Sequence, residues 1–523
     1  MVCRLLRQII DSSAELRYLF ELSCFGYVPP ANPRLDLSYK EKLYILNQHQ
    51  DKWGSDAQMR VDTYRLKNLE ARSMTYDFHS GTYVRGSSLP GMGEYTRRLD
   101  IYQLPSINKG TEWREWSHPN LDVDVRDFAL QTDYDLLVLL EADEPFICAP
   151  LRPANPTPWL CILDLSAKYI FFQVLAWRGA RCYELKIWDW TTGRLISYIE
   201  PSIDGAESFT FLSDQLILVP CPVTFTSDGK LKHQAHLDIY KFDEPSSHDI
   251  AARPAYLVTS FYLPELSEGE PIISRFSCRC DPAPSPSTRV AVPCVQQPRI
   301  FDLAPDSRVL CIAIEALNRR TDFGGRSRTK SMLYIPFTGL LGAIKGSLDE
   351  YNQRGGTATI LWDSWAKMTT WVDIGQIYTG NQCYMYGQRT VGLVYARNEG
   401  ATEDTGEGTE PEDEGTRIHS LVVCDFNPVR VKRASEQTRP GVRISNPETE
   451  NAWDIPMEET KLMRTVFLGG ESKANAPFSV RTTLINEEFH SPYCYVMIDE
   501  EHVVIVLQDL GGRESSLVVY TFN

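Results

Sequence analysis

Residues 185–193 read Leu185-Lys186-Ile187-Trp188-Asp189-Trp190-Thr191-Thr192-Gly193. This short run of branched and aromatic residues, closed by a turn that contains Thr and Gly, is typical of a β-strand. The pattern returns along the chain: a strand with an apolar run, an acidic or polar turn, and a second strand that ends as in Ile239-Tyr240-Lys241 or Val519-Tyr520. Repetition of such a unit predicts a fold built from many small, similar sheets.

Strand-like segments occupy the chain from about residue 74 to its end and form about six or seven units. The clearest segments are 99–104, 125–140, 170–177, 185–190, 208–219, 237–242, 309–314, 332–337, 390–395, 421–426, 503–507 and 517–522. We therefore predict a mainly β fold, with a β-propeller of about six or seven blades over residues 74–523. A pair of β-sandwiches stays open as the alternative. Because the last strand of a propeller often pairs with an early one, Leu99–Leu104 is the expected partner of the C-terminal strand.

The first 55 residues differ, since apolar residues recur there at helical spacing. The apolar positions of three successive predicted helices are Val2, Leu5, Leu6, Ile9 and Ile10; Leu16, Leu19, Phe20 and Leu22; and Leu43, Leu46 and Trp53. Asp11-Ser12-Ser13 interrupts the first two helices, and Gly26 is a C-cap for the second. Ser38 and Glu41 have capping-box spacing at the start of the third. The pattern predicts a short α-helical segment over 1–55 ahead of the β domain.

Three stretches break the strand pattern and are predicted to be disordered insertions. Residues 281–297 are rich in Pro and Ser, and residues 429–450 are polar and partly basic. Residues 399–416 contain eight acidic side chains and no basic one before Arg417. Such a run cannot bury enough apolar surface to fold. It supplies −8 of the net charge of −16, so the remainder is only mildly acidic.

Composition excludes several classes of protein. The chain has 523 residues, 43% of them hydrophobic and 23% charged, which argues against a mostly disordered chain, a collagen or a coiled coil. Its acidic balance argues against a general nucleic-acid binder. The 13 cysteines are scattered, with no Cys-x-x-Cys motif, which indicates a reducing compartment. No apolar run is long enough to span a membrane, and no signal peptide is apparent, so we expect a cytoplasmic or nuclear protein.

The sequence offers few candidates for chemistry. His233 and His236 form a close pair with Asp238 nearby, but zinc needs further ligands, and residues three apart on a strand face opposite sides. Cys278 and Cys280 lack a second thiol pair. Two acidic pairs, Asp124 with Asp127 and Asp363 with Asp373, have the composition of a glycosidase site, although turn acids commonly serve ordinary hydrogen bonding. We therefore predict no catalytic, cofactor-binding or metal-binding residues. Most of the 11 tryptophans are expected in the core.

The N-terminal part reads Val2-Cys3-Arg4-Leu5-Leu6-Arg7-Gln8-Ile9-Ile10 followed by Ser13-Ala14-Glu15-Leu16-Arg17-Tyr18, and it is similar to the second half of an F-box. Together with residues 19–27, 99–106, 125–139, 187–193 and 208–214, it resembles F-box domain-containing proteins of mushroom-forming fungi. The resemblance extends over nearly the whole chain but rests on loose motifs. The family's first helix, which opens with Leu-Pro-x-Glu, has no counterpart ahead of Val2, so we expect a truncated F-box.

This resemblance implies a non-catalytic, substrate-recognition subunit of a cullin-RING ubiquitin ligase of the SCF type. The F-box would bind a Skp-type adaptor protein, and the propeller would hold an unknown protein substrate. Leu5, Leu6, Ile9, Leu16 and Tyr18 would then belong to the F-box core or to its adaptor-binding face. Two alternatives stay open: an interaction scaffold with no link to ubiquitin, and a propeller enzyme with a site in the central channel. An acidic and histidine-rich cluster at the channel mouth would favour the enzyme.

Overall fold

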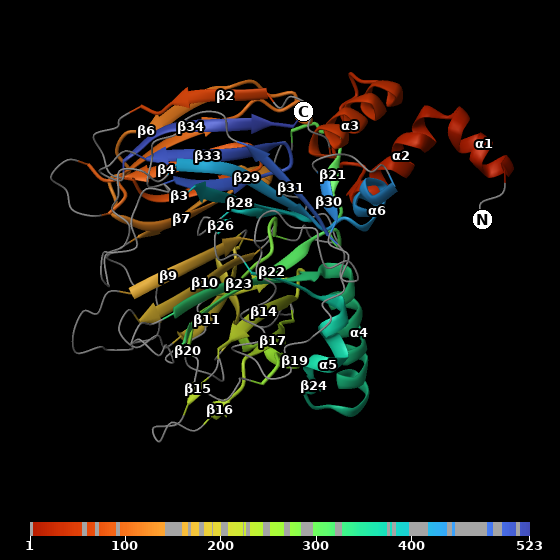
Figure 1. Cartoon of the computed structure of the whole chain (residues 1–523). Helices are drawn as coiled ribbons and strands as arrows, with labels where there is room; N and C mark the ends of the chain where they lie inside the picture. The colour runs from red at the N-terminus through yellow and green to blue at the C-terminus, as the bar shows by residue number, and fades with distance from the viewer. Residues whose placement is uncertain are drawn as a thin grey trace.

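The computed structural model describes residues 4–54, 60–67, 73–89, 95–141, 159–165, 169–176, 182–190, 192–199, 208–222, 224–225, 231–243, 252–265, 272–283, 297–318, 327–373, 377–378, 383–396, 417–436, 442–444, 478–484, 494–508 and 513–522. Over these residues the chain is mainly β, as the sequence predicts, with many small antiparallel sheets and a few helices. Figure 1 shows the labelled helices gathered along one side of the strands. None of the described helices has the length and apolar character needed to cross a lipid bilayer.

The predicted helical segment is present and ends where its capping residues predict. The helices are α1 (Arg4–Ser12), α2 (Ala14–Phe25), α3 (Tyr39–Gly54), α4 (Phe337–Arg354), α5 (Trp362–Trp365) and α6 (Pro428–Glu436), with 3₁₀ turns at Thr132–Tyr134 and Ala366–Met368. Ser13 caps α2 by accepting a hydrogen bond from the Leu16 amide. Gly26, at φ 78°, ends α2 in the left-handed conformation that glycine favours. Ser38 and Glu41 form the predicted capping box, because the Ser38 amide donates to Glu41 Oε2 (2.8 Å) and the Glu41 amide to Ser38 Oγ (3.4 Å).

The described strands form six sheets of four to six strands and three two-stranded ones. The first half of the chain supplies β3 (Ser73–His79), β4 (Thr82–Ser87), β5 (Arg98–Gln103) and β6 (Arg114–His118); then β7 (Val125–Gln131) with β8 (Leu136–Glu141); then β9 (Trp159–Leu165), β10 (Tyr169–Ala176), β11 (Cys182–Asp189) and β12 (Arg194–Ile199) with β18 (Arg253–Pro254); then β13 (Thr210–Phe211), β14 (Leu216–Cys221), β17 (His236–Lys241) and β19 (Tyr256–Tyr262) with β24 (Ala358–Ile360). Two small pairs are β1 (Tyr27–Val28) with β21 (Asp302–Leu303), and β15 (Thr224–Phe225) with β16 (Leu231–His233).

The second half supplies three further sheets. They are β20 (Ile272–Arg279), β22 (Val309–Asn318), β23 (Ser327–Pro336) and β25 (Thr370–Asp373); then β26 (Ile377–Tyr378), β28 (Arg389–Ala396), β29 (Arg417–Asp425), β31 (Ser479–Leu484) and β30 (Val442–Ile444), with β27 (Met385–Tyr386) also paired to β28; and finally β32 (Cys494–Ile498), β33 (His502–Gln508), β34 (Glu514–Thr521) and β2 (Arg60–Arg65). Most sheets are meanders of consecutive strands, which agrees with the repeating pattern in the sequence.

The last sheet joins the two ends of the β region. Its edge strand β2 pairs antiparallel with the C-terminal strand β34, from Arg60 opposite Thr521 to Arg65 opposite Ser516 (Figure 1). The sequence-based partner, Leu99–Leu104, is therefore wrong. That segment is β5, which is already hydrogen-bonded on one side to β4 and on the other to β6. The β region begins at β2, earlier than the predicted residue 74. Charged residues in its sequence, Arg60-Val61-Asp62-Thr63-Tyr64-Arg65, interrupt the apolar pattern that would predict a strand.

Hydrophobic clusters lie between sheets that follow one another in the chain. One cluster packs the β3–β6 sheet on β7 and β8, and another packs β11 and β12 on β14 and β17. Two more join the β13–β19 sheet to the β20–β25 sheet, and the latter to the sheets that contain β28 and β33. A fifth joins the last sheet back to the first through Met497, Val504 and Leu517 of one and Phe78 and Tyr102 of the other. The β3–β6, β13–β19, β20–β25 and last sheets therefore each contribute side chains to two clusters.

Two regions differ from the sequence-based prediction. Helix α6 (428–436) begins one residue before the predicted insertion 429–450, and β30 (442–444) lies within it. Asn427 Oδ1 caps α6 by accepting from the Val429 and Arg430 amides, and Arg430 binds Asp425 at 2.6 Å, so polar residues here are held by specific partners. Helix α4 was not predicted because Gly339, Gly342 and Gly346 weaken its helical signal. The predicted insertion at 399–416 and most of that at 281–297 lie outside the described residues.

Candidate functional site

Large apolar side chains are exposed on the first two helices. We define the α1–α2 apolar surface by the residues Leu5, Leu6, Ile9, Leu16, Leu19 and Phe20. Leu5 is 62% exposed and Phe20 is 52% exposed, and α1 contains no buried residue at all. Helix α1 projects from the rest of the molecule at the N-terminal end (Figure 1). Exposed apolar patches of this kind mark sites of interaction in folded proteins.

Helix α1 depends on local interactions for its conformation. Arg7 and Asp11 form an i,i+4 ion pair at 3.6 Å, but both side chains are well exposed, so the pair contributes little. A helix of nine residues is marginal in water unless its apolar face packs against another surface. The exposed side of α1 therefore provides an apolar surface whose burial by a partner would stabilise the helix.

The opposite side of α2 is buried against the rest of the chain. Tyr18, Leu22 and Phe25 pack with Leu43 and Leu46 of α3 and with the segment 300–303. The Tyr18 hydroxyl donates a hydrogen bond to the Ile300 carbonyl oxygen, and burial raises the pKa of this phenol well above its usual value. Four of the five residues predicted for the F-box core or its adaptor-binding face thus line the α1–α2 apolar surface. Tyr18 does not, because its ring faces the core.

Helix α3 is anchored on the last sheet by its C-terminal turn. The Trp53 indole stacks on Phe522, with ring centroids 3.7 Å apart, and the Arg389 guanidinium lies 4.2 Å from the indole centroid on the face of the ring. His49 Nε2 donates to the Glu500 carbonyl oxygen at 2.7 Å, and Trp53 Nε1 lies 3.3 Å from the same oxygen. Burial and the nearby Arg389 lower the pKa of His49 to about 3, so this ring is neutral.

A buried ion network lies directly beneath this anchor. The Glu500 carboxylate pairs with Lys109 at 2.9 Å and accepts a hydrogen bond from the Tyr386 hydroxyl at 2.8 Å. Arg299 pairs with Asp133 and, at 3.2 Å, with Asp302. Burial opposes ionisation of Glu500, but Lys109 and Arg299 outweigh it and hold the pKa of this carboxyl far below its usual range. These ion pairs tie loops from distant parts of the chain to the base of the helices.

His502, two residues after Glu500, is charged because both of its ring nitrogens face hydrogen-bond acceptors. Its Nδ1 lies 3.0 Å from Asp499 Oδ1, and its Nε2 lies 2.8 Å from the Pro105 carbonyl oxygen. Both ring nitrogens face acceptors, which favours the imidazolium form. Although burial opposes the charge, Asp499 and Glu501 raise the pKa of His502 to about 9. Sequence analysis missed this turn, although Asp499-Glu500-Glu501-His502 between two apolar strands is an unusual run of charge.

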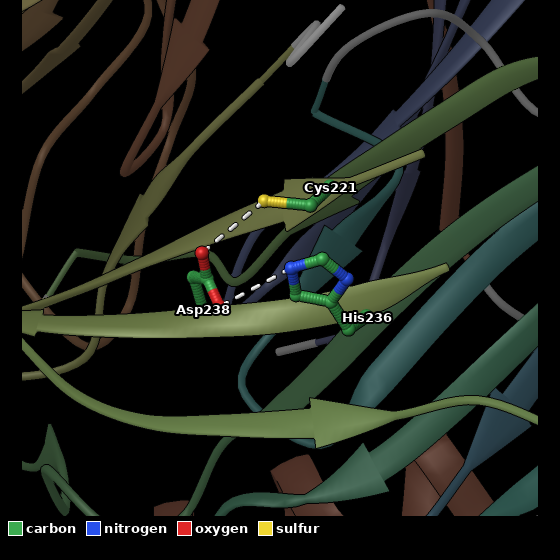
Figure 2. Close-up of side chains that lie close together, drawn as sticks. All are labelled: Cys221, His236 and Asp238. Atoms are coloured by element: carbon green, nitrogen blue, oxygen red, sulfur yellow. Dashed lines mark hydrogen bonds and ion pairs between the residues drawn. The ribbon is translucent and has the colours of Figure 1, made fainter. Parts of the chain in front are cut away.

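A second polar cluster lies far from the helices, in the β13–β19 sheet. Cys221 at the end of β14 is directly opposite His236 in β17, and Asp238 lies two residues further along the same face of β17. Figure 2 shows the three side chains close together, with dashed lines joining Asp238 to each of the other two. Asp238 Oδ2 accepts from Cys221 Sγ at 3.5 Å, and Asp238 Oδ1 lies 3.4 Å from His236 Nε2. All three residues are buried, at 1%, 5% and 1% exposure respectively.

The structure separates the histidine pair named from the sequence. His233 belongs to β16 and its side chain lies outside the described residues, whereas His236 belongs to β17. The ligand-type neighbours of His236 are instead Cys221 and Asp238. Sequence analysis found Asp238 but missed Cys221, because strand pairing brings it across from a position fifteen residues away. Asp238 raises the pKa of His236 against the opposing effect of burial.

The other residues considered from the sequence lie in varied surroundings. Cys278 and Cys280 are buried in an apolar cluster with Phe276 and Leu310. Asp124 pairs with Arg97, which lowers its pKa, whereas burial raises the pKa of Asp127 to about 7. Their environments thus differ.

Asp363 is exposed in the short helix α5, and the side chain of Asp373 lies outside the described residues. Trp362, Trp365 and Trp371 are in the core, as expected.

No protein-family model matches the chain, and no curated protein matches it either. Among solved structures, a protein of unknown function from Dyadobacter fermentans DSM 18053 is similar at 10% sequence identity, over 88% of this chain and 99% of that one, with a TM-score of 0.31. A similarity of this size carries no argument about fold or function.

Proposed function

We propose that this chain is a non-catalytic substrate-recruitment subunit of an SCF-type ubiquitin ligase, and that its α1–α2 apolar surface binds a Skp-type adaptor. The observation that carries the proposal is the exposure of Leu5, Leu6 and Ile9 on a helix with no buried residue. The resemblance of residues 2–18 to an F-box gives the adaptor as the expected partner. Leu5, Leu6, Ile9 and Leu16 of this surface are among the residues that the resemblance assigns to the F-box core or its adaptor-binding face.

We also propose that the six larger sheets, together with β7 and β8, are arranged as a β-propeller of seven blades. Pairing of β2 with β34 supports this, because a strand from the start of the domain closes the last blade in many propellers. The contacts of early strands support it too, since β3 lies beside β7, β7 beside β9, and β14 beside β20. Hydrophobic clusters between consecutive sheets, and between the last and the first, agree with a closed ring.

The mechanism that follows is proximity. The helices would hold the adaptor, and the β domain would hold a protein substrate, while a separate enzyme supplies the ubiquitin-transfer chemistry. The anchoring of α3 through Trp53 and of α2 through Tyr18 supports this role, because a firm connection keeps the substrate at a defined distance from the adaptor. Arg433 of α6 adds a link to Glu21 of α2 at 3.2 Å.

The proposal is tested by binding of the purified full chain to the Skp-type adaptor of the source organism. We expect a complex from the wild-type chain, and at least a tenfold loss of affinity in Leu6→Asp and Ile9→Asp, since each places a charge in a buried apolar contact. The matched control is Leu35→Asp, whose side chain is 89% exposed outside this surface. Absence of binding by the wild-type chain would contradict the proposal and leave the interaction scaffold as the better description.

A further inference from the structure

We propose that Cys221, His236 and Asp238 form a binding site for a single zinc ion. The site belongs to the β domain and is independent of the adaptor-binding proposal. Its donor atoms, one thiol sulfur, one imidazole nitrogen and one carboxylate oxygen, all lie within 4.8 Å of one another. Thiolate and imidazole together favour zinc over magnesium or calcium, which prefer oxygen donors.

The spacing of the donors matches a tetrahedral ion. Zinc–ligand bonds of about 2.0–2.3 Å imply distances of about 3.3–3.7 Å between neighbouring ligand atoms. The separation of His236 Nε2 and Asp238 Oδ1 is 3.4 Å, and that of Cys221 Sγ and Asp238 Oδ2 is 3.5 Å. These two distances end on different carboxylate oxygens, so a single Asp238 oxygen gives one edge of the required length, and all three donor atoms lie within 4.8 Å of one another (Figure 2).

The surroundings orient each ligand. His236 Nδ1 lies 2.7 Å from the Gln234 carbonyl oxygen, so its proton is held there and Nε2 is left to bind a metal. The Tyr262 ring stacks on the imidazole, with centroids 4.9 Å apart. Asp238 accepts hydrogen bonds from the Ser260 hydroxyl at 2.5 Å and from the Tyr240 hydroxyl at 3.3 Å. Hydrogen bonds that hold the ligating side chains in place in this way are typical of protein zinc sites.

Charge balance also fits zinc. A thiolate, a carboxylate and a neutral imidazole carry a total charge of −2, which Zn²⁺ neutralises, and a neutral site is the one that burial tolerates. Binding displaces the thiol proton of Cys221 to solvent, together with the Nε2 proton of any His236 that is protonated. Without metal, the Asp238 carboxylate contacts both Cys221 Sγ and His236 Nε2. Uptake of Zn²⁺ by the purified chain therefore distinguishes a metal site from a metal-free polar cluster.

The test uses the full chain, purified with its metal content measured, then stripped with chelator and titrated with Zn²⁺ and with Co²⁺. We expect one equivalent of either ion, an absorption band for Co²⁺–thiolate charge transfer, and a Tm that rises with Zn²⁺ concentration. Cys221→Ser should abolish the charge-transfer band, and Asp238→Asn should lower zinc affinity at least tenfold. Cys311→Ala is the matched control, because this buried thiol lies outside the cluster.

Two results would overturn the proposal. One is a wild-type chain that binds no Zn²⁺ or Co²⁺ at micromolar concentration while its circular dichroism shows it folded, which would mean a metal-free polar cluster. The other is a Co²⁺–thiolate band that persists in Cys221→Ser, which would place the ion elsewhere. Because the readout on the wild-type chain needs no variant, an unfolded variant would not obscure the outcome. Failure here would leave adaptor binding unaffected.

Discussion

The two sides of the N-terminal helices are similar in sequence and opposite in environment. One side, the α1–α2 apolar surface, exposes Leu5, Leu6 and Phe20. The other side, made by α2 and α3, buries residues of the same chemical kind, such as Leu22 and Leu46. Helix α2 belongs to both, with Leu16 and Leu19 on one side and Leu22 on the other.

The stability of the helical segment comes from its buried side. The buried side has a partner in the same chain, namely the segment 300–303 and the turn at Glu500. The exposed side has no covering element among the described residues. Substitutions on the buried side should therefore change the free energy of unfolding, and substitutions on the exposed side should change binding.

The largest effect is expected for Trp53→Ala. The variant removes an indole that stacks on Phe522 and packs under Arg389, and large-to-small changes of this kind cost about 3–5 kcal/mol of stability. Urea unfolding of the purified chain measures the loss. Tyr44→Ala is the control in the same helix, since Tyr44 is 66% exposed and should change stability by less than about 0.5 kcal/mol. Equal effects in the two variants would show that α3 is not anchored on the last sheet.

A pH-dependent effect is expected for His502, which supports the turn beneath α3. Its folded pKa of about 9 lies above the ordinary value of 6.5, so its contribution is complete below pH 6.5 and is lost as pH rises through 9. A difference of this size corresponds to stability on the order of 3 kcal/mol.

The free energy of unfolding of wild type and of His502→Gln is measured from pH 6 to pH 9.5. The difference between the two should become smaller as pH rises. His118→Gln, at an exposed position, is the control. A gap independent of pH would mean that packing, and not charge, explains the role of His502.

A smaller loss is expected for Tyr18→Phe. The variant keeps the buried ring but removes the hydroxyl that donates to Ile300, which costs about 1–2 kcal/mol because a buried carbonyl loses its partner. Affinity for the Skp-type adaptor should stay within twofold of wild type, as measured by titration calorimetry. A large loss of binding with little loss of stability would instead place Tyr18 at the interface, and would remove the distinction between the two sides.

The smallest change in stability is expected for Ile9→Ala. Its side chain is 46% exposed on α1, so truncation should change the free energy of unfolding by less than about 0.5 kcal/mol. Thermal unfolding of the isolated chain checks this value, and adaptor affinity measured on the same preparation should fall. Destabilisation comparable to that of Tyr18→Phe would show that α1 packs on its own chain in solution.

Local features of the chain were readable from the sequence. The Ser13 cap, the Gly26 cap and the Ser38–Glu41 box set the ends of α2 and α3, because each depends on residues within one helical turn. Alternating and apolar runs correctly predicted a mainly β protein for the same reason. Helix α4 was missed because glycines weaken its helical signal, and strand β2 because charged residues interrupt its apolar pattern, and distant contacts stabilise both.

The sequence by itself determined the elements and their apolar faces, since periodicity is a property of neighbouring residues. Tertiary structure decided which face is covered, that β34 closes on β2, and that Cys221 meets His236 across a strand pair. It also decided the charge of Glu500, because its partner Lys109 lies almost four hundred residues away in the chain, whereas the acidic residues that charge His502 are its neighbours in sequence. Contacts at such separations depend on the packing of whole sheets, and no local pattern records them.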